Sequence, residues 1–133
     1  MTAKTFNTLI AKDVSGDKDA GDLVNKEPSR LAIRDGGHTT WVEQQDIEWI
    51  DAAGDYMCVQ SHGVTHIMRK TMKALEKELD GNILQRIHRS TIVNIKQVRE
   101  MEPHINGEYF LILESGHRVK LSRTYKNKLE LFR

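Results

Sequence analysis

The chain has 133 residues, with 20 lysines and arginines against 19 aspartates and glutamates, so its formal net charge at pH 7 is +1. This length is enough for one hydrophobic core, without metals or disulfides. The near-neutral balance argues against a general polyanion binder, and a single cysteine excludes an intramolecular disulfide. The sequence shows neither a signal peptide nor an apolar run of the ~20 residues that span a membrane, so we expect a cytoplasmic location and no membrane partner.

The charges are unevenly placed along the sequence. Residues 31–68 contain one arginine and six acidic residues, a net charge of −5, whereas residues 84–133 contain ten cations and five acids, a net charge of +5. A domain with this distribution can turn its basic end toward a polyanion while its acidic end points away.

Residues 1–29 differ in composition from the rest of the chain. The stretch Asp13–Asp22 has neither apolar periodicity nor aromatic residues, and the charges of the segment nearly cancel. We therefore expect a flexible linker or a tail from a longer protein, and not a basic arm that wraps nucleic acid. The globular domain is expected to cover residues 30–133.

From Leu31 onward most signals are those of short strands separated by tight turns. Alternating or β-branched runs, bounded by glycine-containing turns such as Asp35–Gly37 and Asn106–Gly107, predict antiparallel hairpins. The predicted strands are Leu31–Ile33, Thr39–Val42, Ile47–Asp51, Tyr56–Gln60, Thr65–Met68, Ile92–Val93, Val98–Met101, Tyr109–Leu113 and Arg118–Leu121. The fold class is therefore mainly β.

One segment has helical periodicity, because apolar residues recur at spacings of four, three and four: Met68, Met72, Leu75 and Leu79. This pattern predicts a helix over about residues 71–79, with Gly81 as its stop. A short C-terminal helical turn is predicted after Ser122, a residue type that favours the N-cap, with Tyr125, Leu129 and Phe132 on one face.

Two polar blocks carry the functional signal, Leu84–Asn94 (LQRIHRSTIVN) and Leu121–Lys126 (LSRTYK). Each places cations beside hydroxyl, amide or imidazole groups, which suits contacts to phosphates and base edges. The candidate DNA-binding residues in these blocks are Arg86, His88, Arg89, Ser90, Asn94, Arg123 and Lys126. On these residues alone, an arginine-rich turn paired with nearby carboxylates is an equally good interpretation.

Both blocks resemble the signature of the LytTR-type DNA-binding domain. The resemblance runs from about Leu31 to Phe132 and includes residues 46–52 and 68–75 in the same order. It implies an elongated antiparallel β-strand arrangement of small sheets and hairpins, with one α-helix and loops at one end that enter successive grooves of duplex DNA. The implied loops are residues 53–56, which add Tyr56 to the candidate site, residues 88–90 and residues 122–126.

Two positions depart from the family pattern. Thr124 stands where family members often have a second arginine, which weakens the expectation that the third loop reads bases. Asp55 stands where the family often has asparagine, and a carboxylate suits a phosphate contact poorly. Arg89 is therefore the first candidate for base reading.

The resemblance also implies a biological setting. Such domains are usually the output domains of bacterial LytR/AlgR-family response regulators and follow a phosphoacceptor receiver domain. Their targets are commonly paired direct repeats in promoters, occupied by two protomers. No receiver domain fits in the first 30 residues. We therefore expect a fragment of a longer regulator or a stand-alone module.

Other function classes have weaker support. The main alternative is a β-rich protein-interaction or anion-sensing module whose basic end receives an acidic partner. No metal is expected, since His62 and His66 lie on a predicted hairpin, where residues four apart are about 13 Å from each other. Cys58 between Met57 and Val59 is expected in the core. No catalytic set and no cofactor motif is present, so we do not expect an enzyme.

Overall fold

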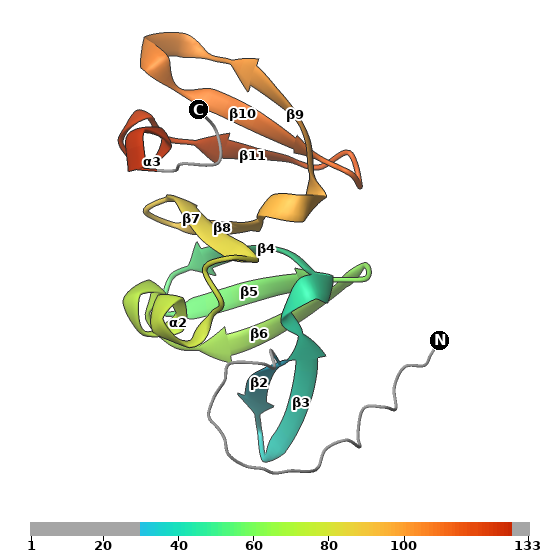
Figure 1. Ribbon diagram of the computed structural model, residues 1–133. Helices are drawn as coiled ribbons and strands as arrows, with labels where there is room; N and C mark the ends of the chain where they lie inside the picture. The colour runs from blue at the N-terminus through green and yellow to red at the C-terminus, as the bar shows by residue number, and fades with distance from the viewer. Residues whose placement is uncertain (1–29, 129–133) are drawn as a thin grey trace, which may run out of the picture.

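The described part of the chain, residues 30–128 of the computed structural model, is an elongated stack of three antiparallel β layers (Figure 1). A two-stranded hairpin forms one end, a five-stranded sheet of order β6-β5-β4-β8-β7 the middle, and a three-stranded sheet of order β11-β10-β9 the other end. The strands are β2 (Arg30–Asp35), β3 (His38–Glu43), β4 (Ile47–Ala53), β5 (Tyr56–Ser61), β6 (Val64–Arg69), β7 (Leu84–His88), β8 (Thr91–Asn94), β9 (Val98–Pro103), β10 (Tyr109–Leu113) and β11 (Arg118–Leu121). The predicted mainly β architecture is confirmed.

Helical elements are short, and all but α3, which follows the last described strand, lie between strands. They are the α-helices α2 (Met72–Glu78) and α3 (Arg123–Lys128), and the 3-10 turns η4 (Gln44–Asp46), η5 (Ile95–Gln97) and η6 (Ile105–Gly107). The 3-10 turns were not predicted. None of the helices within residues 30–128 is both long and apolar enough to cross a membrane.

The middle sheet is buried on both faces where β8 runs through it. Successive residues of a strand point to opposite faces. Ile92 therefore packs into the core shared with the β2–β3 hairpin and α2, while Val93 packs into the core shared with β10 and β11. All four residues of β8 are buried. This two-sided burial fixes the three layers to one another and makes β8 the centre of the domain.

Helix α2 confirms the predicted segment but not the predicted role of Gly81 as its stop. The Thr71 hydroxyl accepts a hydrogen bond from the Ala74 amide (3.0 Å), which caps the N-terminus, and Met72 and Leu75 are buried. The helix ends at Leu79 in an extended conformation (φ −90°, ψ 148°). Gly81 was therefore wrongly predicted as the stop. The chain leaves the helix two residues earlier, where the Gln44 side chain accepts a bond from the next amide, that of Asp80 (2.7 Å).

Strand β7 was missed by the sequence prediction. Its pairing with β8 shifts between Arg86 and His88, so the buried residues Leu84 and Ile87 are three positions apart and the alternation of a regular strand is lost. The predicted N-cap of the C-terminal helical turn is confirmed, because the Ser122 hydroxyl accepts from the Tyr125 amide (3.3 Å). Leu129, Phe132 and the predicted linker over residues 1–29 lie outside the described residues.

Candidate nucleic-acid interface

Three segments meet at one end of the middle sheet: the β4–β5 turn, the β7–β8 turn and the start of α3. The Ser122 amide donates to the Ile87 carbonyl oxygen, and the Ala52 amide donates to the Ser90 carbonyl oxygen, both at 2.9 Å. The end of β7 is thus bonded to the residue before α3, and the β7–β8 turn is bonded to the end of β4. Figure 1 shows the turn, α3 and the C-terminal end of β4 on the same side of the molecule. The structure brings the three predicted loops together.

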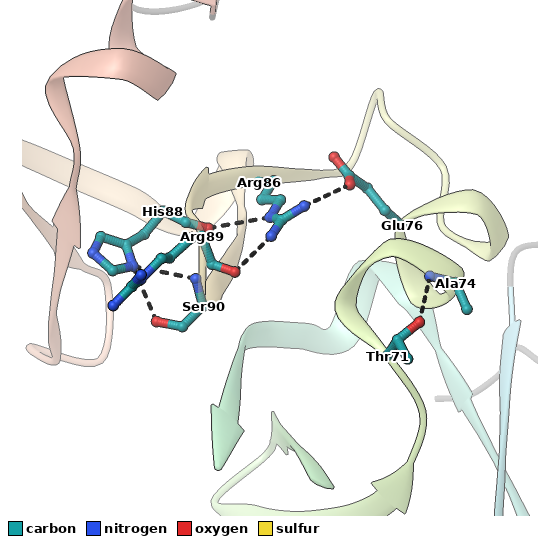
Figure 2. Close-up of polar contacts among 7 residues, drawn as sticks. All are labelled: Thr71, Ala74, Glu76, Arg86, His88, Arg89 and Ser90. Atoms are coloured by element: carbon teal, nitrogen blue, oxygen red, sulfur yellow. Dashed lines mark hydrogen bonds and ion pairs between the residues drawn. The ribbon is translucent and has the colours of Figure 1, made fainter. Parts of the chain in front are cut away.

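Arg86 is held by groups of the protein itself. Its Nε donates to the carbonyl oxygen of His88 (3.3 Å), one terminal nitrogen donates to the carbonyl oxygen of Arg89 (2.6 Å), and the other to the Glu76 carboxylate (3.2 Å; Figure 2). The guanidinium carbon also lies 5.5 Å from the centre of the Tyr125 ring. Its side chain is 20% exposed. The residue that we expected to contact DNA therefore connects the β7–β8 turn to both helices.

His88 shapes the same turn from inside. Its Nδ1 accepts the Ser90 amide (3.2 Å) and lies 3.0 Å from the Ser90 hydroxyl. Burial lowers the pKa of His88 below its ordinary value, and the positive charges of Lys120 and Arg89 lower it further, against a smaller opposing effect of Glu108. The imidazole is therefore neutral at pH 7, with Nδ1 free to accept the hydrogen bond.

Arg89 and Arg123 are exposed. Within the described range neither guanidinium has a carboxylate partner, unlike Arg86. Arg123 begins α3 and lies across the β9–β10 turn, where a Cβ added to Gly107 would be 2.8 Å from the Arg123 Cδ. Lys126, one turn further along α3, has its Nζ 5.2 Å from the centre of the Tyr109 ring. These cations are presented on ordered backbone beside the β7–β8 turn.

The β4–β5 turn carries Tyr56, which is 46% exposed. The Arg69 guanidinium lies 5.9 Å from the centre of the Tyr56 ring and 3.9 Å from the Asp55 carboxylate. The Asp55 carboxylate, which suits a phosphate contact poorly, is thus paired with Arg69 of β6. Tyr56 remains available at this end of the sheet.

Asn94 was wrongly predicted as a DNA contact. It is only 1% exposed, and its amide group donates to the carbonyl oxygens of Gln45 (3.0 Å) and Ile47 (2.9 Å). Its side-chain oxygen accepts the Lys96 amide (2.9 Å) and so begins η5. Because all of these groups are already bonded, Asn94 holds the start of β4 to the end of β8 and cannot reach a ligand.

Two residues of this end were not found from the sequence. Glu76 was not singled out in the sequence, yet it pairs with Arg86. Gly107 looked like an ordinary hairpin residue, yet Arg123 packs on it. The Asn106–Gly107 turn was recognisable, but its position beside α3 depends on the pairing of β10 with both β9 and β11. No group of three or more metal-binding side chains is found among the described residues.

A β scaffold that presents exposed arginines from bonded segments at one end suits an anionic partner such as duplex DNA. The family model of the LytTr DNA-binding domain matches residues 37–132. The chain belongs to the LytTr DNA-binding domain family.

Relatives and a solved structure agree with this membership. The chain is 32% identical over 110 residues to sensory transduction protein LytT of Bacillus cereus, covering 83% of this chain and 45% of the relative. It is 24% identical over 122 residues to transcriptional regulatory protein LytR of Staphylococcus aureus, covering 92% and 50%. The chain thus spans about half the length of the curated relatives it matches. The fold matches a solved structure described as the LytTr DNA-binding domain of a putative methyl-accepting/DNA response regulator from Bacillus cereus, with a TM-score of 0.70, 20% identity, and coverage of 79% of this chain and 96% of that chain.

Proposed function

We propose that this domain binds double-stranded DNA sequence-specifically, as the output domain of a bacterial response regulator of the LytR/LytT type. The observation that carries the proposal is the placement of Arg89 and Arg123 on two segments joined by the Ser122–Ile87 hydrogen bond. The relatives' names, sensory transduction protein and transcriptional regulatory protein, support the same role. DNA as the target implies a cytoplasmic location.

Charge pairing at this end favours an anionic partner. Three acids here are each paired with a cation: Glu76 with Arg86, Asp55 with Arg69, and Glu108 with Lys120. Within the described range, Arg89 and Arg123 have no such partner. Paired acids repel a phosphate backbone less than free ones, so the unpaired arginines dominate the local field.

The segments differ in the contacts they can make. Arg89 extends from a tight turn, and an arginine fork matches the O6 and N7 acceptors of guanine in the major groove. We assign base reading to Arg89. Arg123 and Lys126 lie along α3 and are assigned to phosphates, as is Tyr56, whose hydroxyl can donate. The Ser90 hydroxyl lies 3.0 Å from the acceptor His88 Nδ1 and donates to it, so Ser90 is assigned to the turn. His88 is neutral and supports the turn through the bond that its Nδ1 accepts from the Ser90 amide.

We further propose that two protomers occupy paired repeats in a promoter and that a receiver domain regulates their assembly. The relatives are about twice as long as this chain, which leaves room in those proteins for such a domain. The DNA-contacting residues assigned above are those of one protomer.

Selection of bound duplexes from a random pool tests the function directly. We expect an enriched motif, bound more tightly than a scrambled duplex in fluorescence anisotropy. Acidic peptides serve as competitors, because the alternative function is an interaction module with an acidic partner. Two results together would contradict sequence-specific DNA binding. The random pool would show no enriched motif, and acidic peptides of the same total charge as the duplex would displace the DNA.

A further inference from the structure

We propose that Arg86 is a positioning residue that fixes the shape of the β7–β8 turn and thereby aims Arg89, and that it makes no phosphate contact itself. This inference rests on the proposed DNA-binding function. It departs from the sequence interpretation, in which Arg86 was one of the DNA contacts.

The first support is the geometry of the turn. Arg86 donates to two successive carbonyl oxygens, those of His88 and Arg89, at 3.3 and 2.6 Å. These carbonyls belong to the peptide units before and after the Arg89 Cα, and Figure 2 shows both dashed contacts converging on one guanidinium. A guanidinium is planar with donors in a fixed fork, so it holds the two carbonyls in one relative orientation. A lysine ammonium has no such plane.

The second support is the charge balance of Arg86. The Glu76 carboxylate lies 3.2 Å from the remaining terminal nitrogen, and the Tyr125 ring lies against the guanidinium at 5.5 Å. Because each of its three guanidinium nitrogens already donates a hydrogen bond and its charge is paired, Arg86 offers little to a phosphate. Its partners belong to α2, the β7–β8 turn and α3, so one side chain holds these three elements in place relative to one another.

This role predicts a particular pattern of binding defects. A lost phosphate contact lowers affinity for all sequences equally and reduces the salt slope by about one. A misplaced Arg89 lowers discrimination between the selected and scrambled duplexes and leaves the salt slope unchanged, because the number of neutralised phosphates is the same. The ratio of the Kd values for the scrambled and selected duplexes, together with the salt slope, therefore shows whether Arg86 positions Arg89 or contacts a phosphate.

The first variant is Arg86→Lys, which keeps the charge and loses the fork. We expect the Kd for the scrambled duplex divided by the Kd for the selected duplex to fall roughly tenfold, which is the discrimination that one good base contact supplies. The salt slope should stay unchanged. Rescue of full discrimination by lysine would overturn the proposal, as would equal losses on both duplexes with a slope smaller by about one.

A matched pair on α2 tests the same role if Arg86→Lys does not fold. Glu76 and Glu78 are 45% and 44% exposed and each pairs with a cation, but only Glu76 pairs with Arg86, whereas Glu78 pairs with Lys70. Glu76→Ala and Glu78→Ala remove the same charge. We expect reduced discrimination only in Glu76→Ala. Equal behaviour of the two variants on both duplexes would overturn the proposal.

Hydrogen exchange in the free protein provides a test that needs no DNA. The amides of Ser90 and Ala52 report on the turn, since they are bonded to His88 Nδ1 and to the Ser90 carbonyl oxygen. In Arg86→Lys we expect faster exchange at both amides and unchanged exchange in β10. Unchanged exchange at Ser90 and Ala52 would overturn the positioning role. Failure of the wild-type protein to discriminate duplexes would instead overturn the proposed function.

Discussion

Ser122 and Ile87 join the outer three-stranded sheet to the middle sheet through a backbone hydrogen bond of 2.9 Å. Strand β11 is attached a second time just before it begins, where the His117 ring stacks on Trp49 at 3.7 Å and an angle of 11°. The strand is therefore held at both ends. Because α3 follows β11 directly, the distance between Arg123 and the β7–β8 turn is set by the scaffold and not by a free loop.

The salt dependence of DNA binding tests the phosphate contacts proposed for this end. If ~6 phosphates are neutralised, the logarithm of the association constant falls against the logarithm of salt concentration with a slope of about −5. Fluorescence anisotropy with the selected duplex at several salt concentrations measures the slope. A flat dependence would contradict contact with the phosphate backbone.

Arg89→Ala tests base reading. We expect a loss of roughly 1–3 kcal/mol in binding free energy for the selected duplex and relaxed preference at one base position. The reason is that the exposed guanidinium is the group in the β7–β8 turn best able to form a bidentate contact with guanine. Affinity measurements on duplexes that vary one base pair at a time would reveal the position. A uniform loss on all duplexes would make Arg89 a phosphate contact.

Arg34→Ala is a suitable control for Arg89→Ala. Arg34 is also exposed, but it lies on β2, in the hairpin layer at the far end of the stack (Figure 1). Both variants remove one positive charge. We expect Arg34→Ala to bind the selected duplex within about twofold of wild type, since screening weakens charges more than ~10 Å away.

Asn94→Ala is expected to reduce stability without changing the interface. The substitution leaves the buried carbonyl oxygen of Ile47 without its Asn94 donor, and an unpaired buried group costs about 1–3 kcal/mol; it also removes the part-buried bond to the Gln45 carbonyl oxygen. Urea denaturation would show the lower free energy of unfolding. At a temperature where the variant is folded, its DNA affinity should equal that of wild type, because Asn94 is buried.

Most of the fold follows from local patterns in the sequence. Strands such as β10 and β11 alternate or are β-branched, and their turns contain Asn-Gly or Ser-Gly, so short-range signals suffice. Strand β7 and the end of α2 do not follow such patterns. The bulge at Arg86 breaks the period, and the helix ends through a contact with Gln44, which is 36 residues from Asp80.

The sequence predicted which segments form the candidate site, but not which of their residues face a ligand and which bind the protein itself. Two arginines of one block, three positions apart, have different environments: Arg89 is exposed at the turn, while Arg86 is bonded to Glu76 and to two carbonyl oxygens. Asn94 looked like a polar contact and is a buried bridge to β4. Such differences depend on long-range packing, and residue type alone cannot distinguish a cation that binds a ligand from one that binds its own backbone.

The pH dependence of stability should include a contribution from His88. Its pKa in the folded protein is lowered by burial and by Lys120 and Arg89, whereas the unfolded chain has the ordinary value of about 6.5. The unfolded state therefore binds more protons in the window below about pH 6.5, so stability is full above that pH and falls as the pH decreases toward the folded pKa. Protonation also removes the acceptor for the Ser90 amide. Urea denaturation between pH 5 and 8 measures the effect.

His88→Asn isolates this contribution. An asparagine oxygen can take the place of Nδ1 as acceptor for the Ser90 amide and does not titrate in this range. The difference in unfolding free energy between wild type and His88→Asn should therefore change below about pH 6.5 and be constant above it. A difference that is constant over the whole range would contradict the lowered pKa.

Gly107→Ala tests whether the β9–β10 turn supports Arg123. The added Cβ would lie 2.8 Å from the Arg123 Cδ and 3.3 Å from its Cγ, too close for the side chain to stay in place. The backbone at Gly107 also has a φ of +77°, where alanine costs roughly 1–2 kcal/mol. We expect both lower stability and weaker DNA binding, with a smaller salt slope if Arg123 holds a phosphate.

Gly116→Ala separates these two effects. Gly116 lies in the β10–β11 turn with a φ of +92°, and an added Cβ would meet nothing within 4 Å. Both variants carry the strain of a left-handed alanine, so thermal or urea denaturation should show similar losses of stability. Only Gly107→Ala displaces Arg123, so only that variant should lose DNA affinity beyond what its unfolded fraction explains. Equal affinities for the two variants would show that Arg123 does not need the turn beneath it to engage the duplex.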